Sequence, residues 1–425
     1  MMATISTLGA VAGLVIAIVL IILKVPPVYG MMLGALAGGM IGGAGLTETV
    51  SLMVSGGSGM ASGILRIIAA GMLAGFLIES GSAETIAHTI VKKMGSRFAL
   101  LAIILSAWVL QAVGTFGDVV VVIVAPIALD IALSTRYSKA AASIALIGGI
   151  HAGNIISPNP NTIALAENLG IPMTSVVLGG MIPALAGIAF TYIFMVMLKN
   201  KGEMVDSTKL TNRTVAETRQ LPSIGCALAG PFCTIILLML RPICGITIDP
   251  IVALPIGGVI GAIAIRQPKE MLKYANTGLQ RMSGIVLLLL GTGTISGIIS
   301  NSGLKDTLIS LVEVSGLPGY ILAPLSGIVM GGATASCVAG ATVASQVFGP
   351  TILSFGVTAV QAAVMIHAGC CVFDCLPHGS FFHISAGTLQ MSIKERLKII
   401  PYESLIGFSM TAVATIVYGV LGFTF

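Results

Sequence analysis

The stretch Ile150-His-Ala-Gly-Asn-Ile-Ile-Ser-Pro-Asn-Pro-Asn-Thr162 is a short polar segment inside apolar sequence that is long enough to cross a bilayer. Its first four residues recur as Ile366-His-Ala-Gly369, which runs into a second polar break, Cys370-Cys-Val-Phe-Asp-Cys-Leu-Pro-His-Gly-Ser380. Because the prolines in these segments cannot donate a backbone hydrogen bond, two helices are predicted to stop and restart at membrane depth. Such breaks are tolerated only where they are buried in protein or line a wet cavity, and a pair of them is typical of a transporter binding site.

The composition is that of a polytopic membrane protein. Of its 425 residues, 56% are hydrophobic and 9% are charged, with a mean hydropathy of +1.04, whereas soluble domains carry about 25% charged residues. The net charge of +5 comes from basic residues in short loops, as the positive-inside rule predicts, so no nucleic-acid partner is expected. The seven cysteines show no thiol-rich metal spacing, and neither a metal nor another cofactor is predicted. The expected fold class is an all-α polytopic membrane protein.

The first half is predicted to contain five spans, a re-entrant hairpin and an amphipathic helix. The apolar stretch 98–134 is split by Gly114-Thr-Phe-Gly-Asp118, and basic residues flank both ends, so it is expected to enter the membrane and return. A small-residue loop is expected at 55–59 and an amphipathic helix at 83–94. The spans are 8–23, 28–45, 61–79, the broken helix 140–168, and 173–198.

The second half repeats this order. A hairpin is predicted at 319–350 with its tip at Gly331-Gly-Ala-Thr-Ala-Ser336, a helix near 304–315, and a cytoplasmic surface segment from Arg266 to Arg281. Lys394, Arg396 and Lys398 are expected to mark the cytoplasm. The spans are 221–240, 248–265, 282–300, the broken helix 357–390, and 403–423.

Self-similarity between the halves indicates a repeat. Glu79-Ser-Gly81 aligns with Asn301-Ser-Gly303 at an offset of 301 − 79 = 222, and the two His-Ala-Gly tetrads give 367 − 151 = 216. Five spans per half is an odd number, and the second hairpin lacks basic flanks, so the repeats are predicted to be inverted. The expected organisation is residues 1–198 as the first inverted repeat, 199–220 as a cytoplasmic linker, and 221–425 as the second repeat.

A hairpin tip and a broken helix from each repeat are expected to meet near the midplane and to bind a small anion. Neither centre contains a lysine or arginine, so amides, hydroxyls and half-helix N-termini are expected to hold a carboxylate through partial charges. The candidate substrate-binding residues are Thr115, Gly117, Asp118, His151, Asn154, Ser157, Asn159, Asn161 and Thr162 in the first repeat, and Thr334, Ser336, Thr342, His367, Asp374, His378, Gly379 and Ser380 in the second.

Four of these residues are candidates for carrying a coupling proton: Asp118, Asp374, His151 and His367. An intramembrane acid is costly when it is charged and unpaired, and imidazole titrates near neutrality. Structural alternatives stand beside each role. Asp118 could only cap the helix that follows it, and either histidine could simply hydrogen-bond a neighbouring helix.

The chain resembles the gluconate permease family of proton symporters, within the ion transporter superfamily. The residues that carry the likeness are Gly71-Met-Leu-Ala-Gly-Phe-Leu-Ile-Glu-Ser-Gly81, Phe116-Gly-Asp-Val-Val-Val-Val-Ile-Val-Ala-Pro126, Ser157-Pro-Asn-Pro160, Ala339-Gly-Ala-Thr-Val-Ala-Ser345 and Asp374-Cys-Leu-Pro-His-Gly379. The resemblance implies proton-coupled uptake of sugar acids or small hydroxy acids at a bacterial inner membrane, by a homodimer with a scaffold and a moving transport domain. The last motif departs from the gluconate pattern and looks more like the branch associated with hydroxybutyrate-type acids.

The residues leave three rival functions open. Sodium coupling is the nearest, because unwound carbonyls and Asn, Ser or Thr side chains also coordinate Na⁺. An intramembrane enzyme would use His151, His367, His378 and Asp374 around a metal. An anion channel would pass its substrate without coupling to any gradient. The repeat pattern favours a secondary active transporter over the last two.

Overall fold

The computed structural model describes residues 5–95, 98–205 and 221–424, and these are almost entirely helical. This confirms the predicted all-α class. Within these ranges, seven helices are long and apolar enough to cross a membrane. They are Ala61–Glu79, Gly117–Thr135, Met173–Leu198, Ile224–Cys244, Pro268–Ser300, Cys337–Ser354 and Ile393–Val420. The protein is therefore a polytopic membrane protein.

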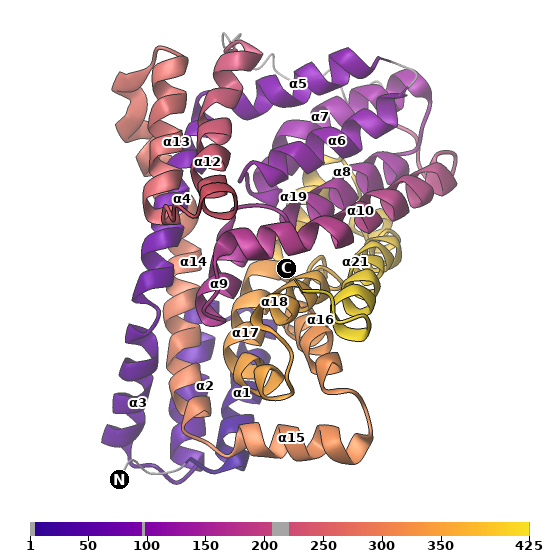
Figure 1. Ribbon diagram of the computed structural model, residues 1–425. Coiled ribbons are helices and arrows are strands. Elements are labelled where there is room, and N and C mark those ends of the chain that lie inside the picture. Colours follow the sequence, from indigo (N-terminus) through magenta and orange to yellow (C-terminus); the bar gives the residue numbers. More distant parts are fainter. Residues whose placement is uncertain (1–4, 96–97, 206–220, 425) are drawn as a thin grey trace.

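One side of the molecule is a wall of long helices, on the left of Figure 1. Its centre is α14 (Met271–Ser300), which packs against α3 (Leu46–Ser58) and α4 (Ala61–Glu79). The helix pairs α1 (Thr7–Ile22) with α2 (Pro27–Ile41), and α12 (Ile224–Cys244) with α13 (Pro250–Ala264), complete it. Glycines allow this close packing, since a Cβ on Gly71 or Gly278 would meet the backbone of the facing helix.

One prediction about this wall was wrong, and the structure adds detail to another. The expected loop at 55–59 belongs largely to α3, because Gly56 packs against Gly293 and Gly297 of α14 and the small residues serve helix contact rather than a turn. The segment from Arg266 to Arg281, predicted to lie at a cytoplasmic surface, is exposed at most of its residues. It consists of a short 3₁₀ turn, η2 (Pro268–Glu270), followed by the first eleven residues of α14 (271–281). Contact of Gly278 with Gly71 holds this segment in the helix.

The rest of the molecule consists of helix–turn–helix units and broken helices. The units are α6 (Ala99–Ala112) with α7 (Gly117–Thr135), and α16 (Leu322–Thr334) with α17 (Cys337–Ser354), preceded by the 3₁₀ turn η3 (Gly319–Ile321). The first broken helix is α8 (Lys139–Asn154) and α9 (Pro160–Asn168), and the second is α18 (Ala359–Cys370) and α19 (Ser380–Thr388). Both predicted breaks are confirmed, although each starts a few residues after its histidine.

The remaining helices close each half of the chain. They are α10 (Met173–Leu198) in the first half, and α20 (Ile393–Leu397) and α21 (Ile400–Ala414) in the second, with α21 continuing into a π-helix at Thr415–Val420. Two amphipathic helices, α5 (Ser82–Met94) and α15 (Leu304–Ser315), lie at opposite ends of the molecule in Figure 1. Most of the predicted linker, residues 206–220, lies outside the described residues.

Candidate functional site

The tips of both helix–turn–helix units and both helix breaks meet around one cavity of about 300 Å³. This is the arrangement that the paired polar segments predicted. Hydrophobic side chains such as Phe116, Ile150 and Phe381 form part of its lining. The candidate residues that line it are Gly117, Asp118, His151, Asn154, Asn159, Asn161, Ser336, Asp374 and Ser380.

The first break is held by a network of neutral amides. Asn159 is the N-cap of α9, and its side-chain oxygen accepts hydrogen bonds from the backbone N–H groups of Asn161 (3.0 Å) and Thr162 (3.2 Å). Its amide group donates to the side-chain oxygen of Asn154 at 2.6 Å, and Asn161 donates to the same oxygen at 3.0 Å. Side chains thus bond to backbone groups that have lost their helical partners at the break.

The same network joins the first break to both helix–turn–helix units, which are the two hairpins predicted from the sequence. Gln111 of α6 donates to the side-chain oxygen of Asn154 at 3.1 Å, so this oxygen accepts from three amides. The amide groups of Asn154 and Asn161 lie 3.2 and 3.3 Å from the sulfur of Cys337, at the start of α17. Gln111 and Cys337 also line the cavity, and neither was among the predicted site residues.

The second break contains titratable groups instead. Asp374 Oδ1 lies 3.2 Å from His151 Nε2, and Cys375 Sγ lies 3.5 Å from the same nitrogen. Both side chains of the Asp374–His151 pair are largely buried. Gly379, the N-cap of α19, has no side chain to offer, and a Cβ there would lie 2.5 Å from the carbonyl oxygen of Ala335. The second hairpin tip therefore rests directly on the second break.

Two groups of side chains here could hold a metal ion. One is His151, Asp374 and Cys375, and the other is Cys337, Cys371 and Asp374. Imidazole, carboxylate and thiolate are donors that suit Zn²⁺. Neither group contains His367 or His378, so the metal constellation weighed as a rival is not assembled among the described residues.

The other predicted site residues lie outside the cavity lining. Thr334, His378 and Gly379 line a neighbouring cavity of about 490 Å³, which shares Ser336 and Ser380 with the central one. His367 is buried, and neither ring nitrogen has a hydrogen-bond partner among the described residues. Buried residues that line neither cavity are Thr115, Ser157, Thr162, Thr342 and His367.

Arg281 corrects the expectation that the site has no lysine or arginine. It lies on α14, lines the central cavity, and its Nη1 is 3.2 Å from Asp118 Oδ2. No local signal in the sequence points to it, because Arg281 is far along the chain from both breaks and both tips. Continuous helix through residues 271–281 brings it there.

Arg396, which with Lys394 and Lys398 was expected to mark the cytoplasm, has a side chain that is fully buried within the protein. Its guanidinium donates to the carboxylate of Glu403 on α21 at 2.8 Å and to the hydroxyl of Ser385 on α19 at 2.9 Å. The guanidinium carbon also lies 5.1 Å from the ring centroid of Phe382. Arg396 therefore fixes α19 to α20 and α21.

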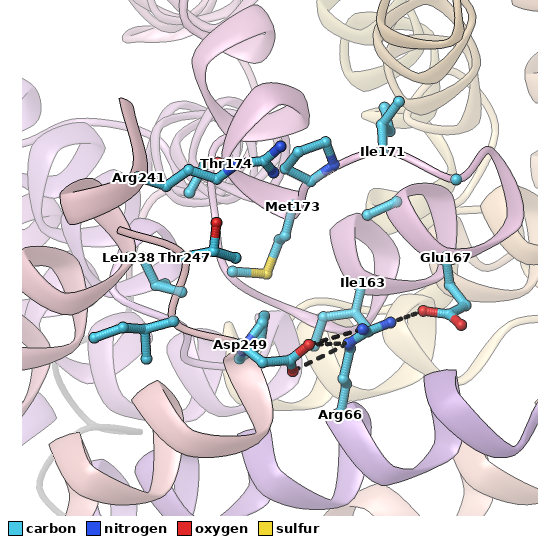
Figure 2. A pocket seen from close by; sticks show the side chains of 15 residues that line it. Arg66, Ile163, Glu167, Ile171, Met173, Thr174, Leu238, Arg241, Thr247 and Asp249 are labelled. Atoms are coloured by element: carbon cyan, nitrogen blue, oxygen red, sulfur yellow. Dashed lines mark hydrogen bonds and ion pairs between the residues drawn. The ribbon is translucent and has the colours of Figure 1, made fainter. Parts of the chain in front are cut away.

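A separate cavity of about 400 Å³ lies between the wall and α9, and Figure 2 shows it. Arg66 of α4 forms ion pairs with two carboxylates there: Glu167 on α9 and Asp249, the N-cap of α13. Arg66 donates hydrogen bonds to the Asp249 carboxylate from Nη2 at 2.8 Å and from Nε at 3.2 Å. Arg66 thus connects the first broken helix to two wall helices.

Comparison with known proteins identifies relatives along the whole chain. The family model of the GntP family permeases matches residues 4–421. An uncharacterized transporter of Haemophilus influenzae is 52% identical over 422 residues, which cover 99% of this chain and all of that protein. A high-affinity gluconate transporter of Escherichia coli is 22% identical over 88% of this chain and 90% of its own length. The D-serine transporter DsdX of the same species is 24% identical over 85% and 84%.

Among solved structures, the YdaH transporter of Alcanivorax borkumensis has a similar fold, with a TM-score of 0.67. The match covers 89% of this chain and 90% of that one at 14% identity. These relatives are transporters and permeases. The protein is accordingly a multi-pass bacterial inner-membrane transporter of small organic substrates and not an enzyme. A family match over nearly the full length, together with the resemblance to gluconate permeases, shows that the chain belongs to the GntP permease family.

Proposed function

We propose that the protein is a proton-coupled symporter of a small sugar-acid or hydroxy-acid anion, such as gluconate or a hydroxybutyrate. The observation that carries the proposal is the central cavity, where both hairpin tips and both breaks meet. Its volume of about 300 Å³ suits a small organic acid, and amides and hydroxyls line it to receive the acid's oxygens. Gluconate and D-serine, which relatives are named for, both carry one carboxylate and at least one hydroxyl group.

The coupling proton is assigned to Asp374 and His151. Their facing atoms are 3.2 Å apart, so one proton can be shared between them, and both lie at the cavity. Both side chains are largely buried, so a proton bound there is held away from solvent, beside the cavity that would receive the anion. Asp118 is a weaker candidate because its carboxylate already has an ion-pair partner, Arg281, at 3.2 Å. His367 does not line the cavity.

The architecture is proposed to be a pair of inverted repeats, residues 1–198 and 221–425, joined by the linker 199–220. Support comes from the order of elements, which runs twice along the chain, and from α5 and α15 at opposite ends of Figure 1. Alternating access would then move hairpins and broken helices against the wall of long helices. The homodimer implied by the family resemblance stays a prediction.

Sodium coupling is the second candidate, favoured by one observation. The side-chain oxygens of Gln111 and Asn161 are buried without a hydrogen-bond partner among the described residues, and amide oxygens are ligands for Na⁺. Transport assays separate the two ions. Purified protein in proteoliposomes is expected to accumulate labelled gluconate or 3-hydroxybutyrate when the outside is more acidic than the inside and no sodium is present. Accumulation that requires a sodium gradient and ignores the pH gradient would overturn proton coupling.

A further inference from the structure

Arg281 has a position that the proposed transport mechanism does not use. Among the described residues that line the central cavity, it is the one lysine or arginine. It comes from α14, whereas the rest of the charged lining comes from the hairpin tip at Asp118 and from the helix breaks. The positive charge of Arg281 on the wall helix α14 therefore shares the cavity with the carboxylates of Asp118 and Asp374.

The Arg281–Asp118 pair lies where two cavities adjoin. Both residues also line a second cavity of about 300 Å³, which extends toward Glu84 on α5 and Ile384 on α19. Arg281 and Asp118 are therefore in reach of an organic acid in either cavity. The side chains are 45% and 34% exposed, so both can be reached from the cavity space.

The pair leaves most of the guanidinium unused. A single nitrogen of Arg281 contacts a single oxygen of Asp118, at 3.2 Å, and no other acceptor contacts Arg281 among the described residues. A guanidinium has five N–H donors in a rigid fork that matches a carboxylate with two parallel hydrogen bonds. Asp118 thus occupies only part of a site that a free carboxylate would fill better.

We infer that Arg281 binds the carboxylate of the transported acid, in competition with Asp118. This inference rests on the proposed function, and it narrows the substrate class to small monocarboxylates. A second carboxylate on the substrate would have to lie near Asp118 or Asp374 without another lysine or arginine to receive it. Binding also replaces a contact between α14 and α7 with one between α14 and the substrate, which frees the tip of the first hairpin.

The test measures binding to purified full-length protein by isothermal titration calorimetry. The probes are gluconate and 3-hydroxybutyrate, their uncharged amides, and the dicarboxylate malate. Wild type is expected to bind at least one monocarboxylate in preference to its amide and to malate. Arg281→Gln is expected to lower that affinity about 10- to 100-fold and to abolish the preference for acid over amide, which corresponds to one charged hydrogen-bonded contact.

Two further variants separate substrate binding from a structural role. Asp118→Asn removes the competitor and is expected to tighten acid binding severalfold. In Asp118→Asn/Arg281→Gln, no charge is left unpaired, so a purely structural pair would regain wild-type affinity, whereas a substrate-binding Arg281 predicts that binding stays weak. Lys273→Gln is the matched control, because it removes a positive charge from the same helix at a residue that pairs with Glu79. Its affinity is expected to equal that of wild type.

Wild-type affinity in Arg281→Gln or in the double variant would overturn the inference while the proposed function stands. Failure of folded wild-type protein to bind any of the acids would instead overturn the proposed function, and the inference with it.

Discussion

The two helix breaks have the same architecture and different chemistry. In the first, Asn159 caps α9 and Asn154 accepts from three amides, so neutral side chains replace the lost backbone partners. In the second, the N-cap is Gly379 without a side chain, and Asp374 lies beside His151 and Cys375. The difference indicates a division of roles, in which the first break fixes the geometry of the cavity and the second supplies the carboxylate that pairs with His151 of α8.

The helices beyond the two breaks are also anchored differently. The first, α9, is tied to the wall through Glu167 and the partly exposed Arg66. The second, α19, is tied to α20 and α21 through Arg396, which is fully buried with Glu403. The first contact joins α9 to a different layer of the molecule, and the second holds α19 to its own neighbours in sequence. Four predictions test this comparison.

Asp374→Asn makes the second break as neutral as the first, and it is expected to have the largest effect. Proton-driven accumulation should be lost, because the proton has no carboxylate to bind, while exchange of labelled for unlabelled substrate persists. Uptake under a pH gradient and counterflow in proteoliposomes measure the two activities. Asp306→Asn, at an exposed position on α15, is the control and should behave as wild type. Undiminished concentrative uptake in Asp374→Asn would place the coupling elsewhere.

The two anchors should differ strongly in their contribution to stability. Glu403→Gln leaves the Arg396 guanidinium charged and buried, so we expect a loss of about 3–5 kcal/mol. Glu167→Gln leaves Arg66 paired with Asp249, and the expected loss is below about 1 kcal/mol. Unfolding of the two variants in detergent, followed with temperature or denaturant, provides the comparison. Equal losses would mean that the contacts of α9 and α19 are equivalent.

Asn154→Ala tests whether the first break is held by its amide network. It leaves the donors of Gln111, Asn159 and Asn161 without the oxygen they share, and we expect a loss of at least about 2 kcal/mol in the free energy of unfolding. Asn168→Ala, which removes donors to Ser345 and Thr342 at the far end of α9, is the matched control and should cost less. A smaller effect at position 154 than at 168 would contradict the assigned role.

The hairpin tips should show the smallest effects, of opposite sign. Gly114 has φ +100°, so Gly114→Ala is expected to cost about 1–2 kcal/mol, although nothing lies closer than 3.6 Å to the new Cβ. Ala335 already has a positive φ of 44°, and Ala335→Gly relieves a similar strain at an entropic cost of about 0.5–1 kcal/mol. The second variant is therefore expected to be neutral or slightly stabilising in thermal unfolding. Destabilisation by Ala335→Gly would show that its methyl group packs usefully against the second break.

Local signals predicted the parts of the fold that local chemistry decides. Prolines and polar residues inside apolar sequence located the breaks, and glycine-rich tips located the hairpins. The parts decided by contacts between distant segments were missed. The sequence predicts a surface segment at 266–281 but not that residues 271–281 are the start of α14. Gly278 packs on Gly71 and extends α14 through them, which carries Arg281 to the cavity. Arg396 has basic neighbours on both sides, and only its partner seven residues later, Glu403, hints that it turns inward.

The shared guanidinium of Arg66 has a consequence for how easily the protein can change shape. If α9 moves away from α4, the ion pair between Arg66 and Glu167 breaks and Glu167 becomes solvated. Arg66 stays paired with Asp249, so its charge is not left without a partner. The barrier to that separation then contains one semi-exposed electrostatic contact, which dissolved ions weaken. If this separation limits the transport rate, the rate should increase with ionic strength. A rate limited by the separation of purely hydrophobic surfaces should not increase in this way.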